Sequence, residues 1–238
     1  MTTTLYLIRH GETDHNASGR MQGWLDIPLN SMGFHQAKLL AHRFRGKRVA
    51  AVYTSPLVRA AETARAVAEA VSVTINIDER LREYNMGDWS GMTFEEIVRS
   101  EPNFSAHGPV EIPVPNGESA QQMYARVSSF LREVTERHPD QRVVAVSHGG
   151  TLAMVVATML GMPVLRRQPF SFGNTSIAKA DFSHGHWRLR TLNDQCHLHM
   201  QTKDAPESAP PETPAEAQEA VDGTLDAGAT EARAGGMP

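Results

Sequence analysis

Short apolar runs alternate with helical patterns along residues 4–192 of this 238-residue chain. The runs have the length of buried strands, and the segments between them repeat apolar residues at helical spacing. This alternation is typical of an α/β fold in which helices flank a mostly parallel sheet. We therefore expect a three-layer α/β sandwich. The expected strands are residues 4–8, 49–54, 73–77 and 142–146, followed by a hairpin of 176–182 and 187–192.

Capping signals mark where several of the expected helices begin. Ser55 is a preferred N-cap residue and Pro56 suits a first helical position, so a helix should start there. The preceding helix, residues 31–45, should bury an apolar stripe of Phe34, Ala37, Leu40, Ala41 and Phe44. Capping boxes predict two further helices at Thr93 and Ser119, and the last helix should cover residues 151–160.

Two segments depart from the alternation. Residues 84–118 hold glycines, prolines and aromatics around one short helix. We expect them to form a small insertion over the carboxyl edge of the sheet, within a domain of residues 1–200. Residues 201–238 are rich in Ala, Pro, Glu and Gly, lack aromatic residues and carry a net charge of −6. Because such a composition cannot bury enough apolar surface to fold, we predict a disordered acidic tail.

Charge and cysteine content narrow the class of protein. The whole chain has a net charge of −4, so residues 1–200 carry about +2, which suits a small anionic ligand. They contain no Lys/Arg run of the kind that marks a nucleic-acid surface. Cys196 is the only cysteine, which excludes an internal disulfide and fits a reducing compartment.

Location and assembly follow from similar arguments. The chain has no basic, apolar leader and no apolar stretch of membrane-spanning length. We therefore expect a cytoplasmic protein without membrane contact. The final hairpin offers an edge strand through which two copies can pair, so a homodimer is compatible with the sequence.

Charged or imidazole side chains follow four of the expected strands. Arg9 and His10 end the first strand, Arg59 lies in the first turn after the second, Glu83 follows the third and His148 follows the fourth. The carboxyl ends of parallel strands share one edge of the sheet, and ligands bind at that edge in open α/β folds. Taken singly, each residue has a structural interpretation, such as a surface ion pair or the filling of a strand end. Their common edge favours a functional site.

The combination of side chains indicates phosphoryl chemistry. Arginine forks bind phosphate in bidentate fashion. Histidine can attack phosphorus and form a covalent intermediate, and a carboxylic acid can protonate the leaving alkoxide. Gly11 directly follows His10, and we expect it to let the chain turn sharply beneath a phosphate.

Four motifs carry a family resemblance. They are Arg9-His10-Gly11-Glu12-Thr13 with Asn16 and Gln22-Gly23, the run from Tyr53 to Ala64, Leu81-Arg82-Glu83, and Ser147-His148-Gly149-Gly150. In this order, and over residues 4–200, the chain resembles the phosphoglycerate-mutase-like branch of the histidine phosphatase superfamily. The other large branch, of acid phosphatases and phytases, has an arginine where this chain has Thr13.

The resemblance implies roles for nine residues. His10 would be the phosphate-accepting nucleophile and Glu83 the proton donor. The phosphoryl group would be clamped by Arg9, Arg59 and His148, in a pocket also lined by Asn16, Gln22, Gly23 and Gly149. The resemblance implies no metal and no other cofactor. The paired histidines that might suggest a metal site are interpreted as surface residues: His184, His186, His197 and His199.

The insertion bears on the choice of reaction. Between Tyr84 and Glu118 the only Arg or Lys is Arg99, whereas six residues are acidic. A mutase needs several cations to retain a bisphosphate and little access for water. The run from Tyr84 to Gly91 is similar to that of the phosphatase members. We therefore favour metal-independent hydrolysis of a small phosphomonoester, with a cofactor-dependent phosphoglycerate mutase as the alternative.

Two further points stay open from sequence alone. A non-catalytic phospho-ligand-binding member is the least favoured hypothesis, because His10 and Glu83 are both present. The apolar residues of the insertion either form a wall for the alcohol part of the substrate or simply pack the insertion on the body. They are Tyr84, Met86, Trp89, Met92, Phe94 and Phe104.

Overall fold

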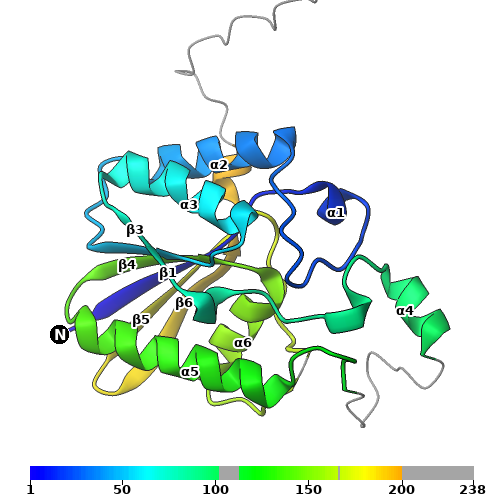
Figure 1. Cartoon of the computed structure of the whole chain (residues 1–238). Coiled ribbons are helices and arrows are strands. Elements are labelled where there is room, and N and C mark those ends of the chain that lie inside the picture. Colours follow the sequence, from blue (N-terminus) through cyan, green and yellow to red (C-terminus); the bar gives the residue numbers. More distant parts are fainter. Residues whose placement is uncertain (102–112, 166, 200–238) are drawn as a thin grey trace, which may run out of the picture. The chain divides into compact units, whose positions relative to one another are not determined.

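The computed structural model describes residues 1–101, 113–165 and 167–199. Its centre is a six-stranded sheet in the order β3-β2-β4-β1-β5-β6 (Figure 1). The first four strands are mutually parallel, whereas β5 runs antiparallel to β1, and β6 antiparallel to β5. The bounds are β1 Thr3–Arg9, β2 Ala51–Thr54, β3 Ile75–Ile77, β4 Arg142–Ser147, β5 Ile177–Ser183 and β6 His186–Asp194. The predicted mostly parallel α/β fold is confirmed.

Helices cover both faces of the sheet. Helices α2 (Ser31–Phe44) and α3 (Val58–Val71) pack together on one face, and α5 (Ala120–Arg137) and α6 (Gly149–Met159) on the other (Figure 1). Successive side chains of a strand point to opposite faces. Leu7 of β1 therefore joins the apolar cluster under α5 and α6, whereas Ile8 joins the cluster under α2 and α3.

Short elements complete the described part of the chain. The helix α1 spans Asp14–Ala17 and α4 spans Phe94–Ser100, while 3-10 turns cover Glu79–Leu81, Gly87–Trp89 and Cys196–His199. The capping boxes predicted at Thr93 and Ser119 are present, and they begin α4 and α5. Across the ranges listed above, no helix is both long and apolar enough to cross a bilayer.

Two local predictions were wrong. Helix α3 begins at Val58, and its N-cap position is Leu57, so Ser55 does not cap it. Phe34 is 45% exposed and lies off the buried stripe of α2. Gly11 does not adopt a positive φ. It is a glycine because a Cβ there would lie 2.6 Å from the backbone oxygen of Gly33 on α2.

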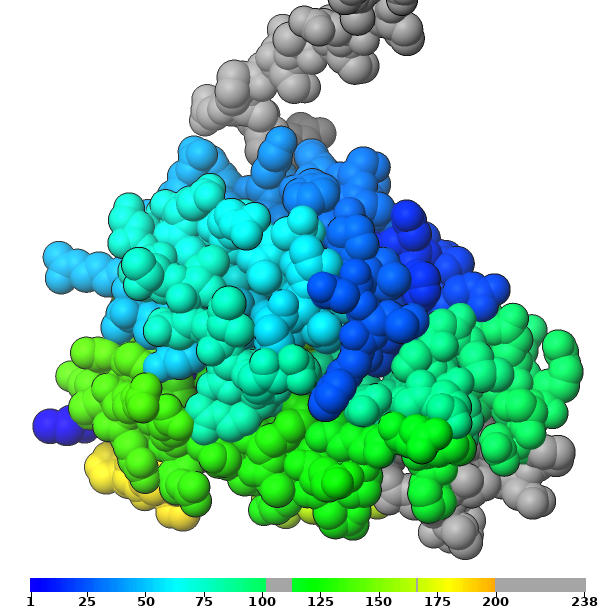
Figure 2. Space-filling view, in the orientation of Figure 1, coloured from blue at the N-terminus to red at the C-terminus, as the bar shows by residue number. Residues whose placement is uncertain are grey.

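The insertion predicted at residues 84–118 is described on either side of 102–112, which lie outside the described residues together with the predicted tail. Its first part contacts the loop that follows α1. The backbone N–H of Met21 donates to the carbonyl of Met92, and the N–H of Gly91 donates to the carbonyl of Met21. In Figure 2 the blue-green insertion borders this blue loop at the surface. These hydrogen bonds join the part of the insertion before residue 102 to the loop that follows α1.

Candidate active site

A cavity of about 720 Å³ opens at the carboxyl edge of the parallel strands. Eight of the nine residues singled out from the sequence line it, namely Arg9, His10, Asn16, Gln22, Gly23, Arg59, Glu83 and Gly149. The ninth, His148, is not a lining residue but lies next to His10, and the two ring centroids are 5.1 Å apart. All nine positions are therefore brought together, although they come from four motifs that are far apart in the sequence.

His10 is held with one ring nitrogen free. Its Nδ1 lies 2.6 Å from the carbonyl oxygen of Gly11, which places the ring proton on Nδ1 and leaves the lone pair of Nε2 available. Burial, followed by the positive charges of Arg9 and Arg59, lowers the pKa of His10 well below its ordinary value. The imidazole is thus neutral and nucleophilic at neutral pH.

Two arginines bring positive charge to this end of the cavity. The guanidinium of Arg9 donates to the carbonyl of Phe172 at 2.6 Å, and that of Arg59 donates to the carbonyls of Gly23 and Leu25 at 2.9 and 2.7 Å. Burial lowers the pKa of Arg59 to about 10, so it stays charged at neutral pH. The Nε atoms of both arginines are buried and have no partner among the described residues. Both guanidinium groups therefore keep donors for an anion.

Arg59 is not a surface residue paired with Glu62 or Glu79. The carboxylate of Glu62 accepts from the backbone N–H of Leu29, and that of Glu79 pairs with Arg82. The Arg59 side chain is fully buried and points into the cavity region instead. An arginine without a carboxylate partner in a buried site is costly unless a ligand supplies the negative charge.

His148 is oriented by Ser55, which the sequence had indicated as a helix N-cap. Its Nε2 lies 2.8 Å from the hydroxyl oxygen of Ser55, which also accepts the backbone N–H of Leu57 at 3.3 Å. Its Nδ1 is buried and has no partner among the described residues. Burial, and then the charge of Arg59, lowers the pKa of His148 well below its ordinary value.

Glu83 lies at the N-terminus of α6. One carboxylate oxygen accepts from the backbone N–H groups of Tyr84 at 2.8 Å and Thr151 at 3.0 Å, and the other accepts from Gly150 at 3.2 Å. A Cβ at Gly150 would lie 2.8 Å from the first of these oxygens, so the glycine leaves room for the carboxylate. The backbone N–H groups of Gly150 and Thr151 lie in the first turn of α6, where a helix leaves its N–H groups without intrahelical partners. The loop after β3 is thus fixed against α6.

Asn174 is a further neighbour of the cavity that the motifs did not indicate. Its side-chain amide donates to the carbonyl of His10 at 3.1 Å and to the side-chain oxygen of Asn16 at 3.2 Å. It comes from the segment before β5, more than 150 residues from either partner. Because Asn174 belongs to none of the four motifs, only the three-dimensional structure reveals its hydrogen bonds to His10 and Asn16.

The comparison with known proteins decides the family. The histidine phosphatase superfamily (branch 1) matches residues 5–195. The chain belongs to this family.

Curated members of the superfamily carry two kinds of name. Phosphoserine phosphatase 1 of Hydrogenobacter thermophilus is 36% identical over 197 residues, which cover 82% of this chain and 93% of that protein. A protein of Yersinia pestis named "Probable phosphoglycerate mutase GpmB" is 31% identical over 208 residues, covering 84% and 97% of the two chains.

Solved structures of the superfamily agree in fold. A mycobacterial glucosyl-3-phosphoglycerate phosphatase is 30% identical with a TM-score of 0.70, and the match covers 81% of this chain and 99% of that one. The phosphoserine phosphatase of Entamoeba histolytica, in complex with 3-phosphoglyceric acid, is 32% identical with a TM-score of 0.72, covering 82% and 99%.

The paired histidines of this histidine phosphatase lie outside the cavity. Within the described ranges, no three His, Cys, Asp or Glu side chains are grouped so that they could hold a metal ion. The expectation of a surface location was wrong for His197, which is buried. Its Nε2 lies 3.0 Å from the hydroxyl oxygen of Thr175.

Proposed function

We propose that this protein hydrolyses a small phosphomonoester through a phosphohistidine on His10. The observation that carries the proposal is a neutral imidazole whose Nε2 is left free by the Gly11 contact, in one cavity with the half-buried Arg9, the buried Arg59 and Glu83. The names of the phosphatase relatives support hydrolysis.

The proposed reaction has two steps. In the first, Nε2 of His10 attacks phosphorus, the bond from phosphorus to the alcohol oxygen breaks, and Glu83 gives its proton to the departing alkoxide. In the second, Glu83 takes a proton from a water molecule as the water oxygen attacks phosphorus, and the bond from phosphorus to Nε2 of His10 breaks. Inorganic phosphate leaves, and both His10 and Glu83 return to their starting states.

The remaining cavity residues, together with His148 next to His10, hold the phosphoryl oxygens in this proposal. Arg9, Arg59 and the Nδ1–H of His148 donate to them, and these donors are already in place before the charge shifts in the transition state. The side chains of Asn16 and Gln22 and the backbone N–H groups of Gly23 and Gly149 complete the pocket. No residue in this scheme depends on a metal ion.

A phosphoglycerate mutase is the second candidate, and the GpmB relative favours it. The small number of cations in the outer cavity argues against a mutase, which would have to bind a second phosphate there. Among the described residues, Arg20 and Arg167 are the cations that line the cavity beyond the phosphate end, and Arg20 is paired with Glu96 at 3.1 Å. The lining there is otherwise largely apolar and includes Met86 and Phe94. This wall suits the alcohol part of an ester better than a second phosphate.

Phosphate release from a panel of phosphoserine, phosphoglycerates, sugar phosphates and aryl phosphates tests the proposal. We expect His10→Ala to lose activity by about 10³-fold or more, since removing a covalent nucleophile has effects of that order or larger. The matched control is His186→Ala, which removes an exposed histidine of β6. Hydrolysis retained in His10→Ala would overturn the mechanism. Efficient isomerisation that needs a bisphosphate primer, with negligible hydrolysis, would establish the mutase instead.

Organisation and location are part of the same proposal. We infer that residues 1–200 suffice for activity, since every proposed site residue lies before residue 150, and that the acidic tail is dispensable for catalysis. The single cysteine supports a cytoplasmic location. The ligand is a small phosphorylated molecule and not a nucleic acid, in keeping with the mild charge of residues 1–200. Pairing of two copies through β6, the edge strand of the sheet, remains a prediction.

A further inference from the structure

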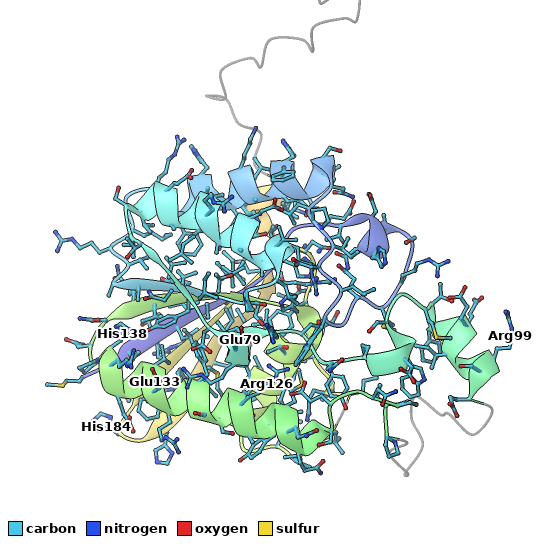
Figure 3. All side chains as sticks on the ribbon, viewed as in Figure 1. Glu79, Arg99, Arg126, Glu133, His138 and His184 are labelled. Carbon is cyan, nitrogen blue, oxygen red and sulfur yellow. The ribbon has the colours of Figure 1, made fainter. Side chains whose placement is uncertain are left out.

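Arg126 lies outside the cavity lining, and the proposed reaction does not use it. It comes from α5 and lies beside the loop between β3 and the insertion (Figure 3). Its side chain is only 15% exposed. A buried arginine that binds no substrate needs another reason to be there, because burying a charge is costly unless it is paired.

All five N–H groups of its guanidinium meet an acceptor. Nη1 donates to the carbonyls of Arg80 at 2.6 Å and Arg82 at 2.9 Å, and Nη2 donates to the carbonyl of Glu83 at 3.1 Å. The other two donors form a bidentate pair with Glu118 at 2.7 and 2.9 Å. The planar fork of arginine thus holds the backbone of three positions of the loop that ends in Glu83.

Glu118 forms hydrogen bonds with the part of the same loop that follows Glu83. Its backbone N–H donates to the carbonyl of Asn85 at 3.0 Å, and its carboxylate accepts the backbone N–H of Asn85 at 3.4 Å. The Glu118 side chain is 11% exposed. Together, Arg126 and Glu118 hold the chain on both sides of Glu83, from residue 80 to residue 85.

The position of Glu83 is therefore fixed at two levels. Its carboxylate rests on the N–H groups of α6, and its backbone carbonyl accepts from Arg126 and also from the indole N–H of Trp24 at 2.7 Å. We propose that Arg126 and Glu118 are positioning residues that hold Glu83 where it can protonate the leaving group. This inference rests on the proposed function, because it needs Glu83 to be the proton donor.

The inference has a chemical consequence that a merely structural role lacks. A misplacement of about 1 Å can cost about 10²-fold in rate, but only for steps that need the misplaced group. An alkyl alcohol is a poor leaving group and needs the proton of Glu83. A nitrophenolate is a good leaving group and hardly needs it. Loss of the hydrogen bonds that Arg126 and Glu118 make to residues 80–85 should therefore reduce hydrolysis of alkyl esters far more than that of nitrophenyl phosphate.

The test compares kcat/KM for glycerol phosphate and for p-nitrophenyl phosphate. We expect Arg126→Gln and Glu118→Gln to lose about 10²-fold on the alkyl ester and less than about 5-fold on the aryl ester. Arg126→Lys should fall between these variants and the unchanged protein, since an ammonium cannot serve all five acceptors. The matched control is Arg132→Gln, an exposed arginine of the same helix, which should leave both values unchanged.

Thermal unfolding of each variant separates positioning from folding. Equal losses on both esters, or no loss on either, in a folded variant would overturn the inference. If Arg126→Gln does not fold, the isosteric Glu118→Gln carries the test. Glu83→Gln is the reference: if it shows no dependence on the leaving group, the proposed function fails at the proton donor. If it shows that dependence and the Arg126 and Glu118 variants do not, the positioning role alone fails.

Discussion

At the scale of single residues, the site depends on keeping two imidazoles neutral beside two cations. His10 and His148 are both buried, and burial is the first cause of their lowered pKa values, followed by the neighbouring arginines. A neutral histidine has one donor and one acceptor nitrogen, and its hydrogen-bond partners decide which is which. The carbonyl of Gly11 can only accept, so it decides this for His10, whereas the hydroxyl of Ser55 can donate to or accept from Nε2 of His148.

The hydroxyl of Ser55 gives a prediction for one residue. When it donates to Nε2 of His148, the proton of the ring lies on Nδ1, where it can donate to a phosphate oxygen. Without this hydroxyl, the ring is no longer held with its Nδ1–H toward the phosphate. A hydrogen bond to a charged group contributes about 1.5–3 kcal/mol, so we expect Ser55→Ala to lower kcat/KM by about 10- to 100-fold. Steady-state kinetics check this.

The matched control for this prediction is Ser128→Ala. The hydroxyl of Ser128 is buried on α5 and has no partner among the described residues. Its removal should leave kcat/KM unchanged. If both variants behaved alike, the hydroxyl of Ser55 would have no specific role toward His148.

At the scale of elements, α2 approaches the loop after β1 more closely than side chains would allow. A Cβ at Gly33 would lie 2.1 Å from the backbone oxygen of Glu12, and one at Gly11 would lie 2.6 Å from that of Gly33. The side chain of Asn30 caps α2, and its amide also donates to Glu12 at 3.0 Å. The loop that carries His10 is thus pressed against the first turn of α2.

Gly33→Ala should therefore destabilise the protein. The methyl group meets backbone atoms, which cannot rotate away, and overpacking of this kind costs about 1–3 kcal/mol. We expect the free energy of unfolding in urea to fall by that amount, with a loss of activity because His10 is displaced. Met32→Ala, at a half-exposed neighbouring position, should leave the free energy of unfolding nearly unchanged. A fully stable Gly33→Ala variant would contradict the close approach.

Elements whose signals are local were predicted well, and those that depend on distant partners were not. The capping boxes at Thr93 and Ser119 involve residues three positions apart, so the sequence alone reveals them. Ser55 has the residue type of an N-cap, but its hydroxyl faces His148, which lies 93 residues away in the sequence.

The residues of the site divide in the same way into those that local motifs indicate and those that depend on distant partners. Its motif residues follow strand ends, and parallel strands bring their carboxyl ends to one edge. Arg126 and Asn174 lie far from those motifs, so only the packing of α5 and of the segment before β5 connects them to Glu83 and His10.

At the scale of the whole molecule, buried histidines couple stability to pH. Burial lowers the pKa of His197 to about 4, and His10 and His148 are shifted in the same direction. In the unfolded chain these groups take up protons near pH 6.5. Below that pH the unfolded state therefore binds more protons than the folded state, and the folded state loses stability as the pH falls.

We predict that the free energy of unfolding decreases between pH 7 and pH 5. Each fully shifted histidine contributes a slope of about 1.4 kcal/mol per pH unit in the interval between its two pKa values. Denaturant titrations at several pH values measure this slope. His197→Asn, outside the cavity, should reduce it. A stability that stays level or rises on acidification would contradict the buried, neutral state of these histidines.

The sheet order has a consequence for how the protein is made. Strand β1 lies between β4 and β5, so Thr4 pairs with Arg142 on one side and with Asp181 on the other. As the ribosome releases the chain, β1 emerges first, and both of its neighbours emerge only after most of the fold has been synthesised. Such long-range pairing is slow and leaves apolar strands exposed in the meantime. His10, at the end of β1, is therefore translated well before the two strands that complete its surroundings.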